Sequence, residues 1–156
     1  MRDDVFELVE YVVNAFGLHG KLTVDLDPLS QHFAVRKEDL RPHGIAGYCT
    51  LPDGEMITED DPVRIIIDRG LGEYEVRLVY AHEIGHGLTR NAGELAMGDI
   101  DQWFVTKAER EAWEVASVLL VPFEAIEVYG ELSRIAVACG VPEQMVEMAM
   151  KCYQGG

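Results

Sequence analysis

Positive charge is scarce in this 156-residue sequence. Lysine and arginine number 13 against 28 aspartate and glutamate residues, which gives a net charge of −15. Such a surface repels phosphate backbones and anionic lipid on average, so direct binding to nucleic acid or to a membrane is not expected. An acidic surface keeps a protein soluble. It also suits a basic protein partner.

Cysteine and long apolar segments are scarce as well. Cys49, Cys139 and Cys152 are far apart and form no Cys-x-x-Cys pair, so neither a disulfide framework nor a cysteine-based zinc site is expected. No apolar run approaches the roughly 20 residues that span a bilayer. Residues 1–7 are acidic where a signal peptide has basic and then apolar residues. We therefore expect a cytoplasmic protein with reduced thiols.

The pattern of apolar residues predicts an α+β fold. With 48% hydrophobic residues, the chain suits one compact domain. A helix is predicted over residues 4–16, followed by strands over residues 21–26, 44–51 and 63–68. Residues 63–68 have the strongest β pattern, a β-branched apolar run, and are expected in the middle of a small mixed sheet. Residues 27–43 have no assignment.

The second half of the chain reads as helical. The expected helices cover residues 73–89, 107–121, 123–138 and 142–153, and a loop covers residues 90–106. Strands followed by helices indicate an α+β domain in which helices pack against the sheet. Within one domain over 1–156, we expect three parts: a helix and sheet over 1–70, site helices over 71–125, and a helical cap over 126–156.

Two histidines and a glutamate form the motif His82-Glu83-Ile84-Gly85-His86. On a helix, residues four apart lie one turn apart on one face, so both imidazoles can bind one ion. A carboxylate at Glu83 then lies beside the ion, where it can take a proton from zinc-bound water. We expect zinc ligands at His82 and His86 and the general base at Glu83. The alternative is a chance coincidence on an amphipathic helix.

The surroundings of the motif favour a site. Val76, Tyr80 and Ile84 form an apolar stripe on the far side of the predicted helix, which is expected to pack on the core and leave the histidine side for a cleft. Gly85 and Gly87 each cost roughly 1 kcal/mol relative to alanine inside a helix. A close approach by another element or by a substrate backbone would explain them, and a looser helix end is the alternative for Gly87.

A catalytic zinc site needs a third protein ligand and a position left open for water. In the predicted helix over 107–121, Glu109 and Glu111 flank the apolar stripe on either side, so helix geometry does not separate them. Thr106 and Glu109 also have the spacing of a capping box, in which the glutamate side chain binds the first N–H of its own helix. Both glutamates remain candidates on this reasoning.

The sequence around the motif resembles the ImmA/IrrE family of metallopeptidases. The resemblance is carried by residues 79–86 and, more specifically, by residues 109–122, and it covers most of residues 5–125. It implies a zincin-like fold with a gluzincin-like ligand set, in which Glu109 is the third zinc ligand. The chain departs from the family at three packing positions: Trp113, Val115 and Val121.

Family members cleave or otherwise inactivate a helix-turn-helix repressor that controls mobile elements, phage genes or stress genes. The resemblance implies a zinc-dependent endopeptidase with a protein substrate. A metal-binding anti-repressor without proteolysis, or a plain interaction module, is the alternative. Residues 132–142 are faintly similar to half of a helix-turn-helix module, but the acidic charge favours a helical cap.

Overall fold

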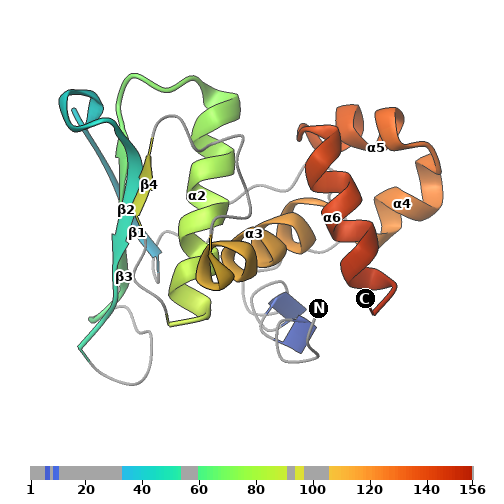
Figure 1. The fold of residues 1–156 in the computed structure, drawn as a ribbon, viewed down its shortest axis with the longest axis horizontal. Helices are drawn as coiled ribbons and strands as arrows, with labels where there is room; N and C mark the ends of the chain where they lie inside the picture. Colours follow the sequence, from blue (N-terminus) through green and yellow to red (C-terminus); the bar gives the residue numbers. More distant parts are fainter. Residues whose placement is uncertain are drawn as a thin grey trace. The chain divides into compact units, whose positions relative to one another are not determined.

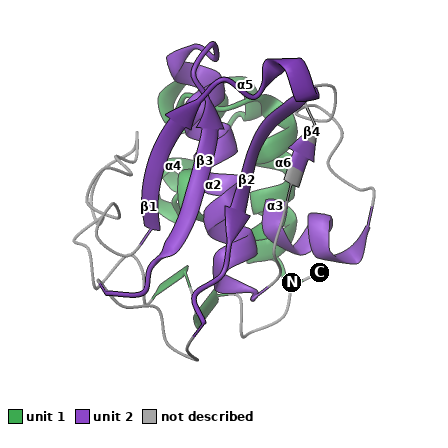
Figure 2. Ribbon diagram, turned by 90° about the vertical axis from the view of Figure 1, so that its left-hand side faces the viewer, with its two compact units in different colours: residues 1–25, 114–156 green, residues 26–113 purple. Residues whose placement is uncertain are grey.

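The structure is a computed structural model, and Figure 1 shows its elements. It describes residues 6–7, 9–10, 33–53, 60–90, 94–96 and 106–155. The expected strand over 21–26 and most of the expected helix over 4–16 lie outside these residues, although residues 6–7 and 9–10 are helical. The chain forms two compact units, residues 1–25 with 114–156 and residues 26–113 (Figure 2).

Within the unit of residues 26–113, the described residues form a mixed sheet of four strands. Their order is β1-β3-β2-β4. The bounds are Phe33–Glu38 for β1, Ile45–Thr50 for β2, Val63–Asp68 for β3 and Glu94–Ala96 for β4. Strand β3 runs parallel to β1 and antiparallel to β2, and β2 runs antiparallel to β4. The α+β class, the mixed sheet and the interior position of residues 63–68 are thereby confirmed.

This unit contains one strand where a loop is predicted and two elements where the sequence gives no assignment. Strand β4 lies inside residues 90–106, so the expected loop is wrong at Glu94–Ala96. Three residues are too few to show the alternation that identifies a strand. The unassigned region contains β1 and a short 3₁₀ helix, η2, at Arg41–His43, where Pro42 suits the first turn.

Side chains cap two carbonyls of the edge strand β1. The Tyr80 hydroxyl donates a hydrogen bond to the carbonyl oxygen of Phe33 at 3.0 Å. The Arg69 guanidinium donates to the carbonyl oxygen of Lys37 at 3.4 Å. The Tyr80 contact therefore joins β1 to the helix at Glu73–Leu88. The Arg69 contact joins β1 to the turn that follows β3.

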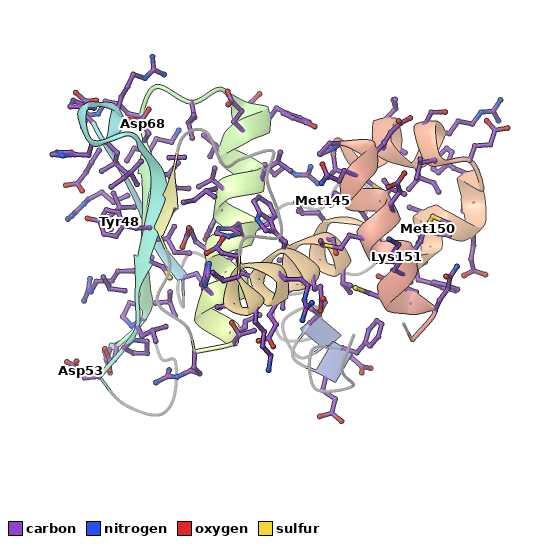
Figure 3. The ribbon with its side chains drawn as sticks, in the orientation of Figure 1. Tyr48, Asp53, Asp68, Met145, Met150 and Lys151 are labelled. Atoms are coloured by element: carbon purple, nitrogen blue, oxygen red, sulfur yellow. The ribbon has the colours of Figure 1, made fainter. Side chains whose placement is uncertain are left out.

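Asp68 closes the end of β3 (Figure 3). This residue is only 1% exposed. One carboxylate oxygen accepts hydrogen bonds from the backbone N–H groups of Leu40 at 2.8 Å and Arg41 at 3.0 Å, and the other accepts from Gly70 at 3.0 Å. Burial raises the pKa of this carboxyl, but the three backbone donors and the Arg41 charge outweigh burial and leave the pKa below its usual value.

Helix α2 (Glu73–Leu88) carries the histidine motif and contacts β2 and β3. The expected helix is confirmed, and Tyr80 and Ile84 are buried as the apolar stripe predicts. The expected open cleft on the histidine side is not found among the described residues, because His82 is 0% exposed and His86 is 1% exposed. The start of helix α3 (Lys107–Leu120) covers that side.

Besides the helical residues 6–7 and 9–10, the described part of the unit of residues 1–25 and 114–156 contains the end of α3 and three further helices. They are α4 at Phe123–Tyr129, α5 at Leu132–Cys139 and α6 at Glu143–Tyr153. The single helix expected over 123–138 is wrong. Gly130 adopts a positive φ of 69°, and its N–H bonds the carbonyl of Ile126, which ends α4.

Tyr153 anchors α6 within this unit. Its hydroxyl donates to the carbonyl oxygen of Val121 at 2.9 Å, and its ring lies 5.3 Å from that of Phe123. Burial raises the pKa of this phenol.

The three cysteines are buried, and none of them forms a disulfide. Burial raises the pKa of Cys152 to about 11, which disfavours its reactive thiolate. Within the described ranges, no helix combines the length and the apolar character needed to cross a membrane.

Candidate metal centre

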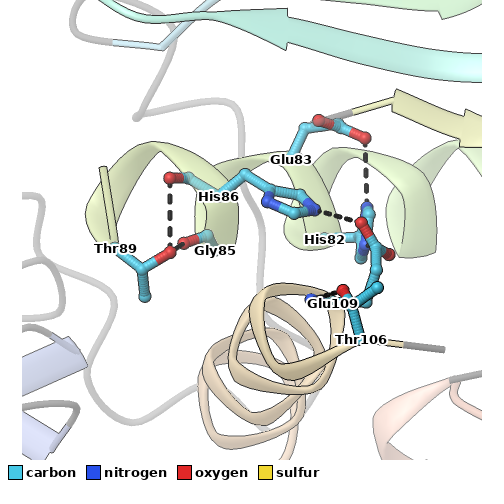
Figure 4. A network of polar contacts seen from close by, with 7 residues as sticks. All are labelled: His82, Glu83, Gly85, His86, Thr89, Thr106 and Glu109. Carbon is cyan, nitrogen blue, oxygen red and sulfur yellow. Dashed lines mark hydrogen bonds and ion pairs between the residues drawn. The ribbon is translucent and has the colours of Figure 1, made fainter. Parts of the chain in front are cut away.

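The imidazoles of His82 and His86 lie one helical turn apart on α2 and face one carboxylate. Their rings meet edge to face with centroids 4.6 Å apart. Nε2 of His82 lies 2.8 Å from Oε2 of Glu109, and Nε2 of His86 lies 2.8 Å from Oε1 of the same side chain (Figure 4). The three ligand atoms all lie within 4.8 Å of one another. They are therefore close enough to bind a single ion.

Glu109 reaches the histidines from the first turn of α3. The Thr106 hydroxyl accepts a hydrogen bond from the backbone N–H of Glu109 at 3.1 Å, which is one half of the anticipated capping box. The Glu109 carboxylate faces the histidines instead of completing the box. Glu111 lies outside the cluster, with its carboxylate 4.0 Å from the Lys107 ammonium on the same helix. The structure therefore separates the two glutamates that helix geometry could not.

Glu83 lies on the other side of His82. Its side chain is 0% exposed, and Oε1 is 3.0 Å from Nδ1 of His82. When Nδ1 carries the proton, it donates to Glu83 and leaves the lone pair of Nε2 for an ion. The second carboxylate oxygen, Oε2, is buried and has no hydrogen-bond partner among the described residues. This oxygen remains available for a ligand or a water molecule.

The charges around His82 favour a cation. Burial lowers the pKa of this imidazole, but hydrogen bonds and charge from Glu109 and Glu83 outweigh burial and raise the pKa to about 9. Burial likewise raises the pKa of Glu109, and its two histidine partners lower it to about 2. Two imidazole nitrogens and a carboxylate are also the donors of many catalytic zinc sites. The residues therefore fit a divalent metal ion in both charge and donor type.

Trp113, which the sequence marks only as a packing position, packs against the cluster. Its side chain is 0% exposed, and its ring centroid lies 4.4 Å from that of His82 at an interplanar angle of 40°. It lies four residues after Glu109, so both side chains share one face of α3. That spacing from a candidate ligand was the available signal in the sequence.

No family model, no curated protein and no solved structure matches the chain. The resemblance carried by residues 79–86 and 109–122 therefore stays a prediction.

Proposed function

We propose that the chain is a zinc-dependent endopeptidase with a zincin-like fold. The single observation that carries the proposal is the convergence of Nε2 of His82, Nε2 of His86 and the Glu109 carboxylate within 4.8 Å. Three protein ligands of this kind leave a fourth position on zinc for water or substrate. The buried Glu83 beside them supplies a base, which a purely structural zinc site does not need.

The chemistry divides between the ion and the protein. A zinc ion held by His82, His86 and Glu109 supplies Lewis acidity for a peptide carbonyl and for an attacking water. Glu83 accepts a proton from that water at Oε2, the carboxylate oxygen that has no partner among the described residues. The same carboxyl then donates the proton to the leaving amine. The other oxygen of Glu83 holds Nδ1 of His82 and thereby orients the imidazole.

The proposed substrate is a cytoplasmic helix-turn-helix repressor, by the resemblance to the ImmA/IrrE family. The net charge of −15 supports this choice, because a DNA-binding protein presents a basic surface. Opposite charges of this kind increase the rate at which two proteins meet.

A second candidate is a metal-binding anti-repressor that inactivates its partner by binding alone. His82, Glu83 and His86 are all 0% to 1% exposed. Their burial favours this candidate, because a substrate peptide bond has to reach the metal ion before it can be cleaved. The Glu109 side chain is 20% exposed, so the cluster has some access to solvent.

Co-expression with a candidate helix-turn-helix repressor from the same genome, followed by mass spectrometry, tests the two candidates. A cut that disappears in Glu83→Gln, with zinc content retained, is the expected result. Glu111→Gln is the matched control, since this carboxylate on α3 lies outside the cluster, and it should leave cleavage intact. Repressor inactivation that persists unchanged in Glu83→Gln would contradict hydrolysis and support binding alone.

A further inference from the structure

Gly85 marks the closest approach of α2 and α3. A Cβ atom added to this glycine would overlap the carbonyl oxygen of Ala112 and would lie 2.9 Å from its carbonyl carbon and its Cα. All three are backbone atoms of α3, so no side-chain rotation can relieve the overlap. The two helices therefore touch backbone to backbone, and only glycine at position 85 permits it.

This crossing lies beside the metal cluster on both helices. Gly85 directly precedes His86 and follows His82 by three residues, and Ala112 follows Glu109 by three residues. Residues three apart on a helix share a face. The separation of α2 and α3 at the crossing therefore determines how far the Glu109 carboxylate stands from the two imidazoles.

The Trp113 ring makes a second contact across the same helix pair. Trp113 directly follows Ala112 in the sequence. Its ring lies against the His82 ring, with the two centroids 4.4 Å apart. One contact limits how closely the backbones approach, and the other is a buried ring that resists sliding of one helix past the other. Together they define a single placement of the first turns of α3.

We propose that Gly85 is a positioning residue that makes Glu109 the third ligand by holding α3 in contact with α2. The inference rests on the proposed metal site. Ligand distances at a metal are held to within about 0.2 Å. A Cβ at position 85 needs a larger displacement of the α3 backbone than that, because real Cβ atoms essentially never come within 3.0 Å of such neighbours.

Gly87 offers a matched control on the same helix. A Cβ atom there would lie 3.0 and 3.1 Å from the two γ-methyl groups of Val63 and 3.3 Å from the Phe33 ring. These are side-chain atoms of the sheet and none belongs to α3, so the new methyl group at position 87 presses on the sheet and not on the α3 backbone. Gly85→Ala and Gly87→Ala therefore improve helix propensity equally but differ in what the new methyl group meets.

Zinc affinity of the purified full chain, measured by competition with a chromogenic chelator, tests the proposal. We expect Gly85→Ala to bind zinc at least about tenfold more weakly and Gly87→Ala to stay within about threefold of the unsubstituted chain. The absorption spectrum of the cobalt-loaded Gly85→Ala protein should match that of Glu109→Ala, because both lose the carboxylate ligand. Unchanged affinity in Gly85→Ala would overturn the proposal.

A double-mutant cycle separates positioning from a general loss of structure. If Gly85 acts through Glu109, the double variant Gly85→Ala/Glu109→Ala binds zinc no more weakly than Glu109→Ala alone. Additive losses would overturn the proposal. An unsubstituted chain that binds neither zinc nor cobalt would sink the proposed function as well, whereas a binding chain with additive losses sinks only the role of Gly85.

Glu109→Asp tests the contact without a new methyl group, should Gly85→Ala fail to fold. This variant keeps the carboxylate but shortens its reach by one methylene. Because α3 already touches α2 at Gly85, the helix cannot move closer to compensate. Zinc affinity should therefore fall as far as in Glu109→Ala. An affinity within about threefold of the unsubstituted chain would show that the Gly85 contact does not limit how closely α3 approaches α2.

Discussion

Thr106 and Glu109 share one half of a capping box. The Thr106 hydroxyl accepts the Glu109 N–H at 3.1 Å, while the Glu109 carboxylate lies 2.8 Å from Nε2 of both His82 and His86. The threonine thus fixes the backbone at the start of α3, and the glutamate side chain is left free for the cluster. Local helix capping and the candidate metal cluster therefore use different groups of the same residue.

Loss of this cap should weaken α3. Thr106→Ala removes the acceptor of the Glu109 N–H, and we expect the free energy of unfolding to fall by about 1 kcal/mol. Urea denaturation of the metal-free protein measures the change. Thr106→Ser keeps a hydroxyl and should retain most of the stability, so equal losses in the two variants would contradict capping by the hydroxyl.

Trp113 should report metal binding by its fluorescence. The chain has two tryptophans, so Trp103→Phe leaves Trp113 as the sole indole. Because its ring lies 4.4 Å from the His82 ring, coordination at that imidazole changes the indole's immediate surroundings. We expect the emission to change with added zinc and to saturate at one equivalent.

Glu109→Ala in the same Trp103→Phe background is the control for that titration. It removes one ligand and leaves the Trp113 and His82 rings in place, so the same change should require more zinc. If metal analysis shows that the protein binds zinc but the Trp113 emission does not change, the ion is bound away from His82.

Zinc should stabilise the folded chain, because the three ligands come together only on folding. At a free zinc concentration one hundred times the dissociation constant, the expected gain in the free energy of unfolding is about 2.7 kcal/mol. Thermal denaturation with zinc and then with excess chelator measures it. His86→Ala should lose most of the gain, and an equal gain in that variant would locate the bound zinc elsewhere.

The Asp68 carboxylate should make stability depend on acid. Its pKa in the folded state lies below the ordinary value of 3.8, so its contribution is present above about pH 4 and is lost as pH falls through the folded-state pKa. Asp68→Asn should lower the free energy of unfolding by about 2 kcal/mol at pH 7, because the amide cannot satisfy all three backbone donors. The difference from the unsubstituted chain should shrink toward pH 3.

Asp53→Asn is the matched control for that measurement. Asp53 is exposed, so its substitution should change stability by no more than about 0.5 kcal/mol. Urea denaturation at several pH values gives both comparisons. A constant difference between Asp68→Asn and the unsubstituted chain down to pH 3 would show that the charge of Asp68 is not what stabilises the fold.

The sequence predicted those elements whose pattern is long and regular. The β-branched run Val63–Asp68 and the apolar periodicity of Glu73–Leu88 led to the correct strand and helix. One glycine is tolerated within a helical pattern, so periodicity does not predict the break at Gly130, whose positive φ of 69° ends α4. A break set by one backbone angle leaves little trace in hydrophobic periodicity.

Residue spacing alone predicts the first half of the candidate site, whereas Glu109 is selected only by the family resemblance. His82 and His86 have a spacing that itself implies a shared ion, because both belong to one helix. Glu109 and Glu111 could not be separated by residue pattern, since the choice depends on how α3 crosses α2. That crossing is set by contacts such as the one between Gly85 and the Ala112 backbone, which no local spacing encodes.

The capped carbonyls of β1 bear on how the protein behaves when concentrated. An edge strand with free backbone groups is a template on which another chain can add a strand and begin aggregation. In β1, the carbonyls of Phe33 and Lys37 already accept donors from Tyr80 and Arg69. An incoming strand would have to compete with a side chain near each end of this six-residue edge, which disfavours growth of the sheet into a multi-chain assembly.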